Sequence, residues 1–139
     1  MQLRTYRPAD EAAVVELWKA CGLTRPWNDP HKDIARKVAE QPELFLIGEI
    51  DGRLMATAML GYEGHRGWMY YLAVDPRFQG HGYGRMLMAH AEALLIARGC
   101  PKINLLVREG NDALLALYDK LGYTRDAAVS LGKRLIPDQ

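Results

Sequence analysis

Short hydrophobic runs, separated by glycine, proline and polar residues, divide the first third of the chain into predicted elements. Residues 2–6 alternate weakly between polar and apolar positions and predict a first strand. Apolar residues recur at helical spacing over residues 8–21, which predicts a helix. Asp29 is then a suitable N-cap for a second helix over residues 30–40, which begins with a proline.

Three strand-like runs occupy the middle of the chain. Residues 44–50 and 54–62 are joined by Asp51 and Gly52, and an Asp-Gly pair is the strongest short signal for a β-hairpin. These two strands should therefore pair antiparallel. Residues 68–74 form a third run, rich in aromatic side chains, and an Asp-Pro pair ends it.

A turn with three alternate glycines leads from the third run into an amphipathic helix. Gly99 is the expected end of this helix, because glycine tolerates the left-handed conformation that follows many helices. Residues 103–107 then predict another strand. The apolar face of the helix comprises Tyr83, Leu87, Ala91, Leu94 and Leu95.

The last part of the chain predicts one more helix and further strands. Asn111 can cap that helix, and Gly122 can end it. Residues 123–135 are expected to hold one or two strands. The side chains expected to face inward from the helix are Leu114, Leu117, Tyr118 and Leu121.

The order of these elements, β-α-α-β-β-β-α-β-α-β, predicts an α/β (α+β) fold with one mixed, mostly antiparallel sheet and about four flanking helices. A strand, helix, strand crossover joins residues 68–74 to residues 103–107, so these two strands should run parallel. At 139 residues the chain has room for one ordinary domain, and we expect residues 1–139 to form it.

Composition and charge narrow the classes of function. Hydrophobic residues make up 49% of the chain and charged residues 25%, which is typical of globular proteins. The net charge of +1 lacks the basic footprint of nucleic-acid binding. The sequence shows no membrane span or signal peptide, so a cytoplasmic location is expected. Its scattered histidines and its two cysteines, Cys21 and Cys100, lack metal-ligand spacing, so no metal is expected.

The most informative segment is residues 72–87, a strand followed by the glycine turn and the start of a helix. Glycines at Gly80, Gly82 and Gly84 let the backbone approach a ligand, and the helix adds its positive dipole end, which favours a phosphate group. The lysine of a nucleoside-triphosphate P-loop is absent. Arg85 replaces the third glycine of the dinucleotide fingerprint, which makes a dinucleotide ligand improbable.

The segment Gln79-Gly80-His81-Gly82-Tyr83-Gly84 instead matches the pattern [RQ]-x-x-G-x-[GA] of the GNAT superfamily of acyl-CoA N-acyltransferases, which the chain resembles. Two further family features are a strand that ends in a small residue and valine, and a later Asn, Leu-Tyr and Leu-Gly-aromatic series. They correspond here to Leu72-Ala73-Val74 and to Asn111, Leu117-Tyr118 and Leu121-Gly122-Tyr123. More narrowly, residues 25–30, 64–67, 97–102 and 131–135 resemble the YpeA-like bacterial acetyltransferases.

The resemblance implies the GNAT fold, with a central splayed pair of parallel strands, and acetyl-CoA as cosubstrate. The backbone at Leu72 and Val74 would hold the pantetheine arm, and the N–H groups from Gly80 to Arg85 would hold the pyrophosphate. His81 is equally well a solvated loop residue. The full set implied for coenzyme A is Leu72, Val74, Gln79, Gly80, His81, Gly82, Tyr83, Gly84, Arg85, Asn111 and Tyr118.

The resemblance also implies direct attack of an amine on the thioester, without an acyl-enzyme. Tyr118 occupies the position of the general acid, although a tyrosine on an inner helix face is often a core residue. The glutamates that serve as bases in relatives are replaced by Trp68 and Leu106. Glu63 is the predicted catalytic base, and the alternatives are His65, Tyr70, Glu109 and Asp29.

The acceptor is expected to be a primary amine: a small molecule, an amino-acid-like compound or a peptide N-terminus. Asp29 could meet an ammonium group or simply cap a helix. The missing glutamates leave an alternative, an acyl-CoA-binding or regulatory module with little turnover. No nucleic-acid or membrane partner is expected, and a homodimer is left open. The expected acceptor-binding residues are Trp27, Asn28, Asp29, His65 and Tyr70.

Overall fold

The computed structural model describes residues 1–139 and separates them into two compact units. The larger unit contains residues 1–105 together with 138–139, and the smaller unit contains residues 106–137. The expectation of a single domain over residues 1–139 stays a prediction. No helix in the chain is long and apolar enough to cross a membrane.

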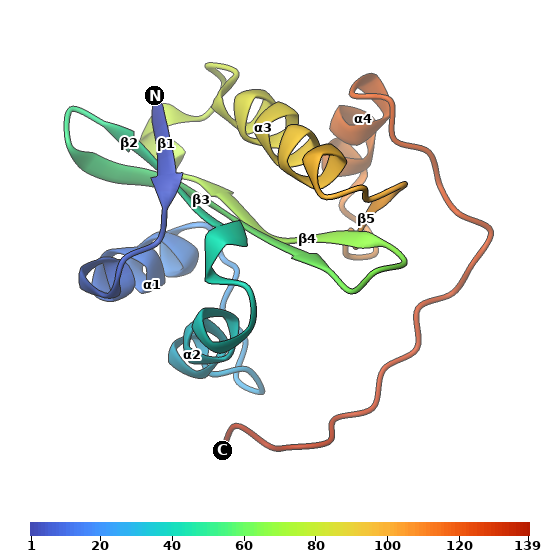
Figure 1. The fold of residues 1–139 in the computed structure, drawn as a ribbon, viewed down its shortest axis with the longest axis horizontal. Helices are drawn as coiled ribbons and strands as arrows, with labels where there is room; N and C mark the ends of the chain where they lie inside the picture. Colours follow the sequence, from blue (N-terminus) through green and yellow to red (C-terminus); the bar gives the residue numbers. More distant parts are fainter. The chain divides into compact units, whose positions relative to one another are not determined.

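A five-stranded sheet forms the centre of the larger unit (Figure 1). Its strands lie in sequence order; the first three neighbouring pairs are antiparallel and the last pair is parallel. The prediction of a mixed, mostly antiparallel sheet is confirmed. The strands are β1 (Gln2–Thr5), β2 (Phe45–Ile50), β3 (Arg53–Tyr62), β4 (Gly67–Val74) and β5 (Ile103–Leu105).

Three α-helices cover the sheet of the larger unit. Figure 1 shows α1 (Glu11–Ala20) and α2 (Pro30–Glu40) on one face and α3 (Tyr83–Ala97) on the other. A short 3-10 turn lies before each of α1, β2 and α3. These turns are η1 (Pro8–Asp10), η2 (Pro42–Leu44) and η3 (Pro76–Phe78). The predicted first helix therefore consists of a 3-10 turn and a slightly shorter α-helix.

Local sequence signals account for the β2–β3 hairpin and for the start of α2. Asp51 and Gly52 both have positive φ, 51° and 74°, which the right-handed twist of a two-residue hairpin favours. The Asp29 carboxylate accepts a hydrogen bond from the His31 N–H at 2.9 Å, so Asp29 caps α2 as predicted. Both elements are confirmed because a few adjacent residues specify them.

The core of the larger unit lies on both faces of the sheet. Between the sheet and α1, an aromatic stack runs from Tyr6 through Phe45 and Trp18 to Tyr71, with ring centroids 4.6, 6.2 and 3.7 Å apart. The stack joins the residue after β1 to β2, α1 and β4 and packs α1 on the sheet. On the α3 side, the buried helix residues are Leu87, Met88, Ala91 and Leu95.

The two C-terminal residues belong to the larger unit. The Asp138 carboxylate accepts hydrogen bonds from the Asp29 N–H and the Arg36 guanidinium, both at 2.6 Å. The Lys32 ammonium donates to the Asp138 carbonyl at 2.8 Å. A buried carboxylate at the start of α2 is also favoured by the positive end of the helix dipole. The chain end is therefore anchored to the first turns of α2.

The smaller unit contains one helix, α4 (Asp112–Lys120). The Asn111 side chain accepts from the Leu114 N–H at 3.2 Å, which confirms the predicted cap. Tyr118 is buried, but Leu117 is 44% exposed, so the prediction that Leu117 faces inward is wrong. Leu117 is next to Tyr118, and the 100° step between adjacent helix positions turns it away from the buried face.

Residues 123–135 contain no strand, so the prediction of one or two strands there is wrong. A strand needs a neighbour that completes its row of backbone hydrogen bonds, and the smaller unit contains no other strand. Val129 and Leu131 are accordingly 86% and 91% exposed. The predicted strand 103–107 is also shorter than expected, because pairing with β4 ends at Leu105.

Candidate functional site

The two halves of β4 have different neighbours. Its first half pairs with β3 on one side and β5 on the other, with Gly67, Trp68 and Met69 opposite the three residues of β5. The parallel pairing then stops, because β5 ends at Leu105. From Tyr70 to Val74, the strand has a partner on the β3 side only, and its other edge carries no strand.

Backbone hydrogen bonds show which peptide groups of β4 face this open edge. The Asp75 N–H donates to the Met55 carbonyl at 2.8 Å, and Ala73 is in register with Thr57. Peptide groups alternate in direction along an antiparallel strand, so Ala73 faces β3 and the peptide groups of Leu72 and Val74 face away. The N–H groups of Leu72 and Val74 thus point to the edge expected to hold the pantetheine arm.

A bulge separates the two halves of β4. Met59 pairs with Tyr70, but Thr57 pairs with Ala73, so one extra residue lies on the β4 side. Tyr71, inside the bulge, has a φ of 49°, in the left-handed region that bulky residues seldom adopt. No pattern in the sequence predicts this irregularity.

The glycine turn follows β4 and opens into α3. Gly80 and Gly82 have φ values of 83° and 82°, which explains glycine at both positions. A Cβ atom at either residue would have no heavy atom within 4 Å, so the backbone borders open space. A Cβ on Gly84 would lie 4.0 Å from Val74 Cγ2, which places the first turn of α3 beside the end of β4.

The start of α3 supplies hydrogen-bond donors to this open space. The first helical bond after the turn runs from the Met86 N–H to the Gly82 carbonyl at 3.1 Å. The N–H groups of Tyr83, Gly84 and Arg85 precede it and have no acceptor within the helix. Donors at a helix N-terminus, next to glycines that leave room for a ligand, fit a pyrophosphate.

Gln79 and His81 flank the glycine turn in different ways. The Gln79 amide nitrogen donates to the Val74 carbonyl at 2.9 Å, so this side chain ties the turn to the end of β4. The Cys21 thiol donates to the same carbonyl at 3.3 Å, and burial raises the pKa of Cys21. His81 is exposed and lies with its ring centroid 6.0 Å from that of Tyr83.

Asn111 and Tyr118 lie in the smaller unit. The Asn111 side chain caps α4. The Tyr118 ring packs edge-on against Tyr123, with centroids 5.5 Å apart, and burial raises the pKa of its hydroxyl. Its hydroxyl is therefore protonated at neutral pH. A contact of either residue with coenzyme A stays a prediction.

Glu63 and two of the expected acceptor-binding residues lie near the turn between β3 and β4. The Glu63 carboxylate accepts from the Arg66 N–H at 2.6 Å, and this backbone hydrogen bond lowers the pKa of Glu63. His65 is exposed in the same turn. Tyr70 is 45% exposed and stacks on Trp68 at 6.4 Å; burial and the nearby Glu63 charge raise its pKa.

The other expected acceptor-binding residues occupy the loop before α2. Trp27 is 55% exposed, while Asn28 and Asp29 are partly buried. An isolated antiparallel bridge joins Arg25 to Asn28 and folds the loop back on itself. Asp29 is held by its capping bond and by Asp138, so a structural role accounts for its position.

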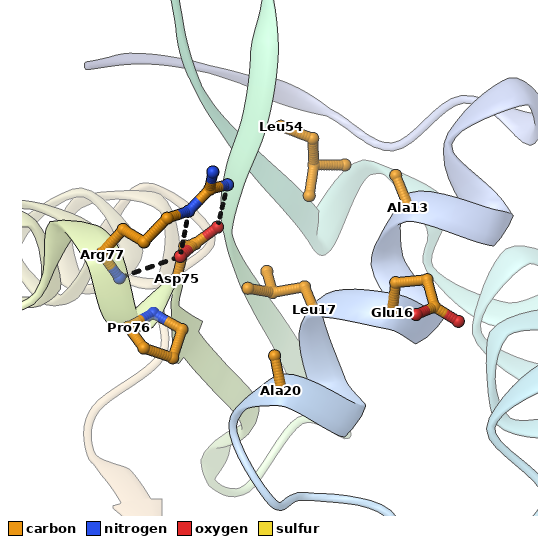
Figure 2. A pocket seen from close by; sticks show the side chains of 8 residues that line it. All are labelled: Ala13, Glu16, Leu17, Ala20, Leu54, Asp75, Pro76 and Arg77. Carbon is orange, nitrogen blue, oxygen red and sulfur yellow. Dashed lines mark hydrogen bonds and ion pairs between the residues drawn. The ribbon is translucent and has the colours of Figure 1, made fainter.

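A shallow hollow of about 480 Å³ lies between α1 and the segment after β4, and Figure 2 shows its side chains. The Asp75–Arg77 ion pair, 2.8 Å long, borders it. None of the residues predicted for the coenzyme or the acceptor lines this hollow. Its lining consists of Ala13, Glu16, Leu17, Ala20, Leu54, Asp75, Pro76 and Arg77.

Four residues beside the bulge were not identified as functional from the sequence. The Trp18 indole donates to the Thr57 hydroxyl, and the Thr57 hydroxyl donates to the Tyr71 carbonyl, both at 2.9 Å. The Tyr71 hydroxyl donates to Asp33 at 2.7 Å. Helical spacing marks Trp18 only as a core residue, and no motif connects it to Thr57.

No group of three or more His, Cys, Asp or Glu side chains could hold a metal ion.

Comparison with known proteins gives consistent results. The model of the acetyltransferase (GNAT) family matches residues 11–123. A protein named acetyltransferase from Yersinia enterocolitica is 50% identical over 139 residues, which cover 100% of this chain and 99% of that protein. A Yersinia pestis protein named an uncharacterized N-acetyltransferase is 49% identical over the same shares.

Solved structures agree with these matches. The crystal structure of the ribosomal-protein-S18-alanine N-acetyltransferase from Escherichia coli is 25% identical, with a TM-score of 0.75. The match covers 91% of this chain and 79% of that one. The structure of Ard1 from Thermoplasma volcanium is 24% identical, with a TM-score of 0.81 over 91% of this chain and 84% of that chain, and shows a similar fold.

Proposed function

Because the chain belongs to the acetyltransferase (GNAT) family, we propose that it transfers an acetyl group from acetyl-CoA to a primary amine by direct attack in a ternary complex. The open edge of β4, followed after η3 by the glycine turn, carries this proposal. The N–H groups of Leu72 and Val74 would hold the pantetheine arm, and the donors from Gly80 to Arg85 would hold the pyrophosphate.

The chemistry needs a polarised carbonyl and a proton for the leaving sulfur. The amine nitrogen attacks the thioester carbon, the carbon–sulfur bond breaks, and the sulfur leaves as a thiolate. The Val74 N–H would stabilise the negative charge that develops on the carbonyl oxygen. Tyr118 would donate its proton to the thiolate, and its raised pKa supports this role because it keeps the hydroxyl protonated at neutral pH.

The proton lost by the amine needs an acceptor, and Glu63 is the proposed one, acting through water. Its lowered pKa makes it a weak base. Deprotonating a lysine-like amine with a pKa near 10.4 costs about 4 to 5 kcal/mol at pH 7, whereas an α-amine with a pKa near 8 costs about 1 to 1.5 kcal/mol. A weak base therefore favours an α-amine, in a free amino-acid-like molecule or at a peptide N-terminus.

The acceptor is proposed to bind between the loop before α2 and the face of β4 that bears Tyr70. Trp27 and Tyr70 are exposed aromatic side chains that could pack on the acceptor, and Asn28, Asp29 and His65 supply polar groups. Small-molecule sites are typically lined by aromatic and apolar side chains with a few polar groups.

Amine-dependent release of coenzyme A thiol tests the proposal. The purified protein is mixed with acetyl-CoA and a panel of α-amines, peptides and lysine side chains with blocked α-amines. We expect release that depends on the amine and is faster for α-amines. Faster lysine acetylation would contradict the acceptor assignment. Binding of acetyl-CoA without amine-dependent release across the panel would favour a binding or regulatory module. The presence of Trp68 and Leu106 where relatives have glutamates supports that alternative.

A further inference from the structure

Tyr71 adopts a backbone conformation that its own side chain does not favour. Its φ of 49° lies in the left-handed region, where an L-residue with a large side chain is strained. Asn, Asp or Gly would be the usual residues there. The surrounding structure must therefore hold Tyr71 in place, since strained residues persist only where their contacts over-determine them.

Two buried side chains hold the Tyr71 backbone. Thr57 and Trp18 are each 0% exposed. The Thr57 hydroxyl donates to the Tyr71 carbonyl and accepts from the Trp18 indole N–H, each bond 2.9 Å long. One hydroxyl thus satisfies two buried polar groups, and both would lose their partner if it were removed.

The Tyr71 side chain is held independently of its backbone. Its ring stacks on Trp18 with a centroid separation of 3.7 Å and an angle of 9° between the planes. Its hydroxyl donates to Asp33 Oδ2 at 2.7 Å, which connects β4 to α2. Burial and the Asp33 carboxylate raise the pKa of Tyr71, so the hydroxyl remains a donor throughout the neutral range. We call Trp18, Asp33, Thr57 and Tyr71 the Tyr71 network.

The bulge decides which peptide groups of β4 reach the open edge. Side-chain and peptide directions repeat every two residues in a strand, so one extra residue reverses both for everything that follows. With the bulge, Ala73 pairs with Thr57 and the Val74 N–H faces outward. Without it, Ala73 would face outward and the Val74 N–H would face β3. β5 ends opposite Met69, just before this point.

We propose that Trp18, Asp33 and Thr57 are positioning residues that hold Tyr71 in the left-handed conformation and thereby present the Val74 N–H to the acyl-CoA thioester. This inference rests on the proposed function, because that function makes acyl-CoA the ligand of the open edge. The three residues would act through the bulge, without contacting the coenzyme.

Substitutions at Thr57 test the backbone contacts. Thr57→Val keeps the branched shape but removes the hydroxyl, and Thr57→Ser keeps the hydroxyl. We expect Thr57→Val to raise KM for acetyl-CoA and lower kcat, each by about tenfold, because two buried hydrogen bonds are lost beside the bulge. Thr57→Ser should stay within about twofold of wild type in both parameters. All assays are run well below the melting temperature of each variant.

Tyr71→Phe provides a second test if Thr57→Val does not fold. It keeps the stacked ring and removes only the bond to Asp33, so we expect about a threefold to fivefold loss of kcat/KM. Tyr62→Phe is the matched control, because the Tyr62 hydroxyl bonds the Gly99 carbonyl at 3.4 Å, outside the network. That control should retain wild-type kcat and KM.

Amide hydrogen exchange separates this inference from the proposed function. In the wild type, the Ala73 amide should be protected and the Val74 amide should exchange faster; in Thr57→Val this contrast should shrink or reverse. If the wild type shows no binding of acetyl-CoA, the proposed function fails, and the exchange pattern still tests the bulge. Unchanged exchange, or reduced stability with unchanged KM and kcat in both Thr57→Val and Tyr71→Phe, would overturn the positioning role.

Discussion

The two halves of β4 use the same kind of backbone for different purposes. The first half, from Gly67 to Met69, is hydrogen-bonded on both sides and contributes to the sheet. The second half, ending at Val74, pairs with β3 alone and leaves the N–H groups of Leu72 and Val74 at an open edge. The difference arises from the early end of β5 and from the bulge at Tyr71. The open edge therefore depends on two features together, the early end of β5 and a bulge whose backbone is contacted by buried side chains.

Gly82→Glu should have the largest effect on the second half. The new side chain would fill the open space beside the turn, and its negative charge would repel the pyrophosphate, so we expect coenzyme A affinity to fall roughly 100-fold or more. Isothermal titration measures this loss. Gly99→Glu is the control, since Gly99 has the same φ of 82° and equal space but lies after the far end of α3. Equal affinities in the two variants would contradict the site.

Tyr118→Phe tests whether acetyl transfer needs the Tyr118 hydroxyl, a group that belongs to neither half of β4. Loss of the protonated hydroxyl should lower kcat about 10- to 100-fold, while coenzyme A affinity stays within about twofold. Steady-state kinetics and titration give the two values. Tyr123→Phe, in the same unit, should retain wild-type kcat. A Tyr118→Phe variant with normal kcat would leave Tyr118 as a core residue only.

Gly67→Ala, in the first half of β4, should lower stability and leave coenzyme A affinity unchanged, the reverse of the expectation for Gly82→Glu. A Cβ there would lie 2.7 Å from Leu95 Cδ1 and 2.9 Å from Cys100 Sγ, so overpacking should lower the free energy of unfolding by about 1–3 kcal/mol. Urea denaturation measures this change, and coenzyme A affinity should be unaffected below the melting temperature. Gly61→Ala in β3, whose nearest neighbour would be 3.8 Å away, is the control. Reduced affinity without reduced stability would break the contrast between the halves.

Glu63→Gln should have the smallest effect. We expect about a threefold to fivefold decrease in kcat, because the role proposed for Glu63 is that of a weak base acting through water. Its lowered pKa keeps the carboxylate ionised throughout the neutral range, so kcat/KM should rise only with deprotonation of the acceptor amine, near pH 8. Wild type and variant should therefore have parallel pH profiles. A rise in kcat/KM between pH 5 and 7 that is present in the wild type and absent in Glu63→Gln would contradict this expectation.

The sequence predicts elements whose signals are local. The Asp51-Gly52 hairpin and the Asp29 cap of α2 each depend on a few adjacent residues, and both are confirmed. The glycine turn is predictable for the same reason, since positive φ values at Gly80 and Gly82 require glycine.

Features that depend on distant residues were not predictable. One or two strands are predicted over residues 123–135, but a strand also needs a partner, which the sequence of that segment does not specify. The bulge at Tyr71 depends on Thr57 from β3 and Trp18 from α1. The resemblance implies a coenzyme A contact for Gln79, which stays a prediction; the hydrogen bond from its amide to the Val74 carbonyl depends on the fold and was not predictable.

The anchoring of Asp138 to α2 changes what kind of segment carries Tyr118. Residues 106–137 form a loop closed at both ends on the larger unit, rather than a tail with one loose end. Closing a loop removes conformational entropy from the unfolded as well as the folded chain. The contacts of Asp138 therefore constrain the second end of the segment that contains α4, and replacing Asp138 would release that end.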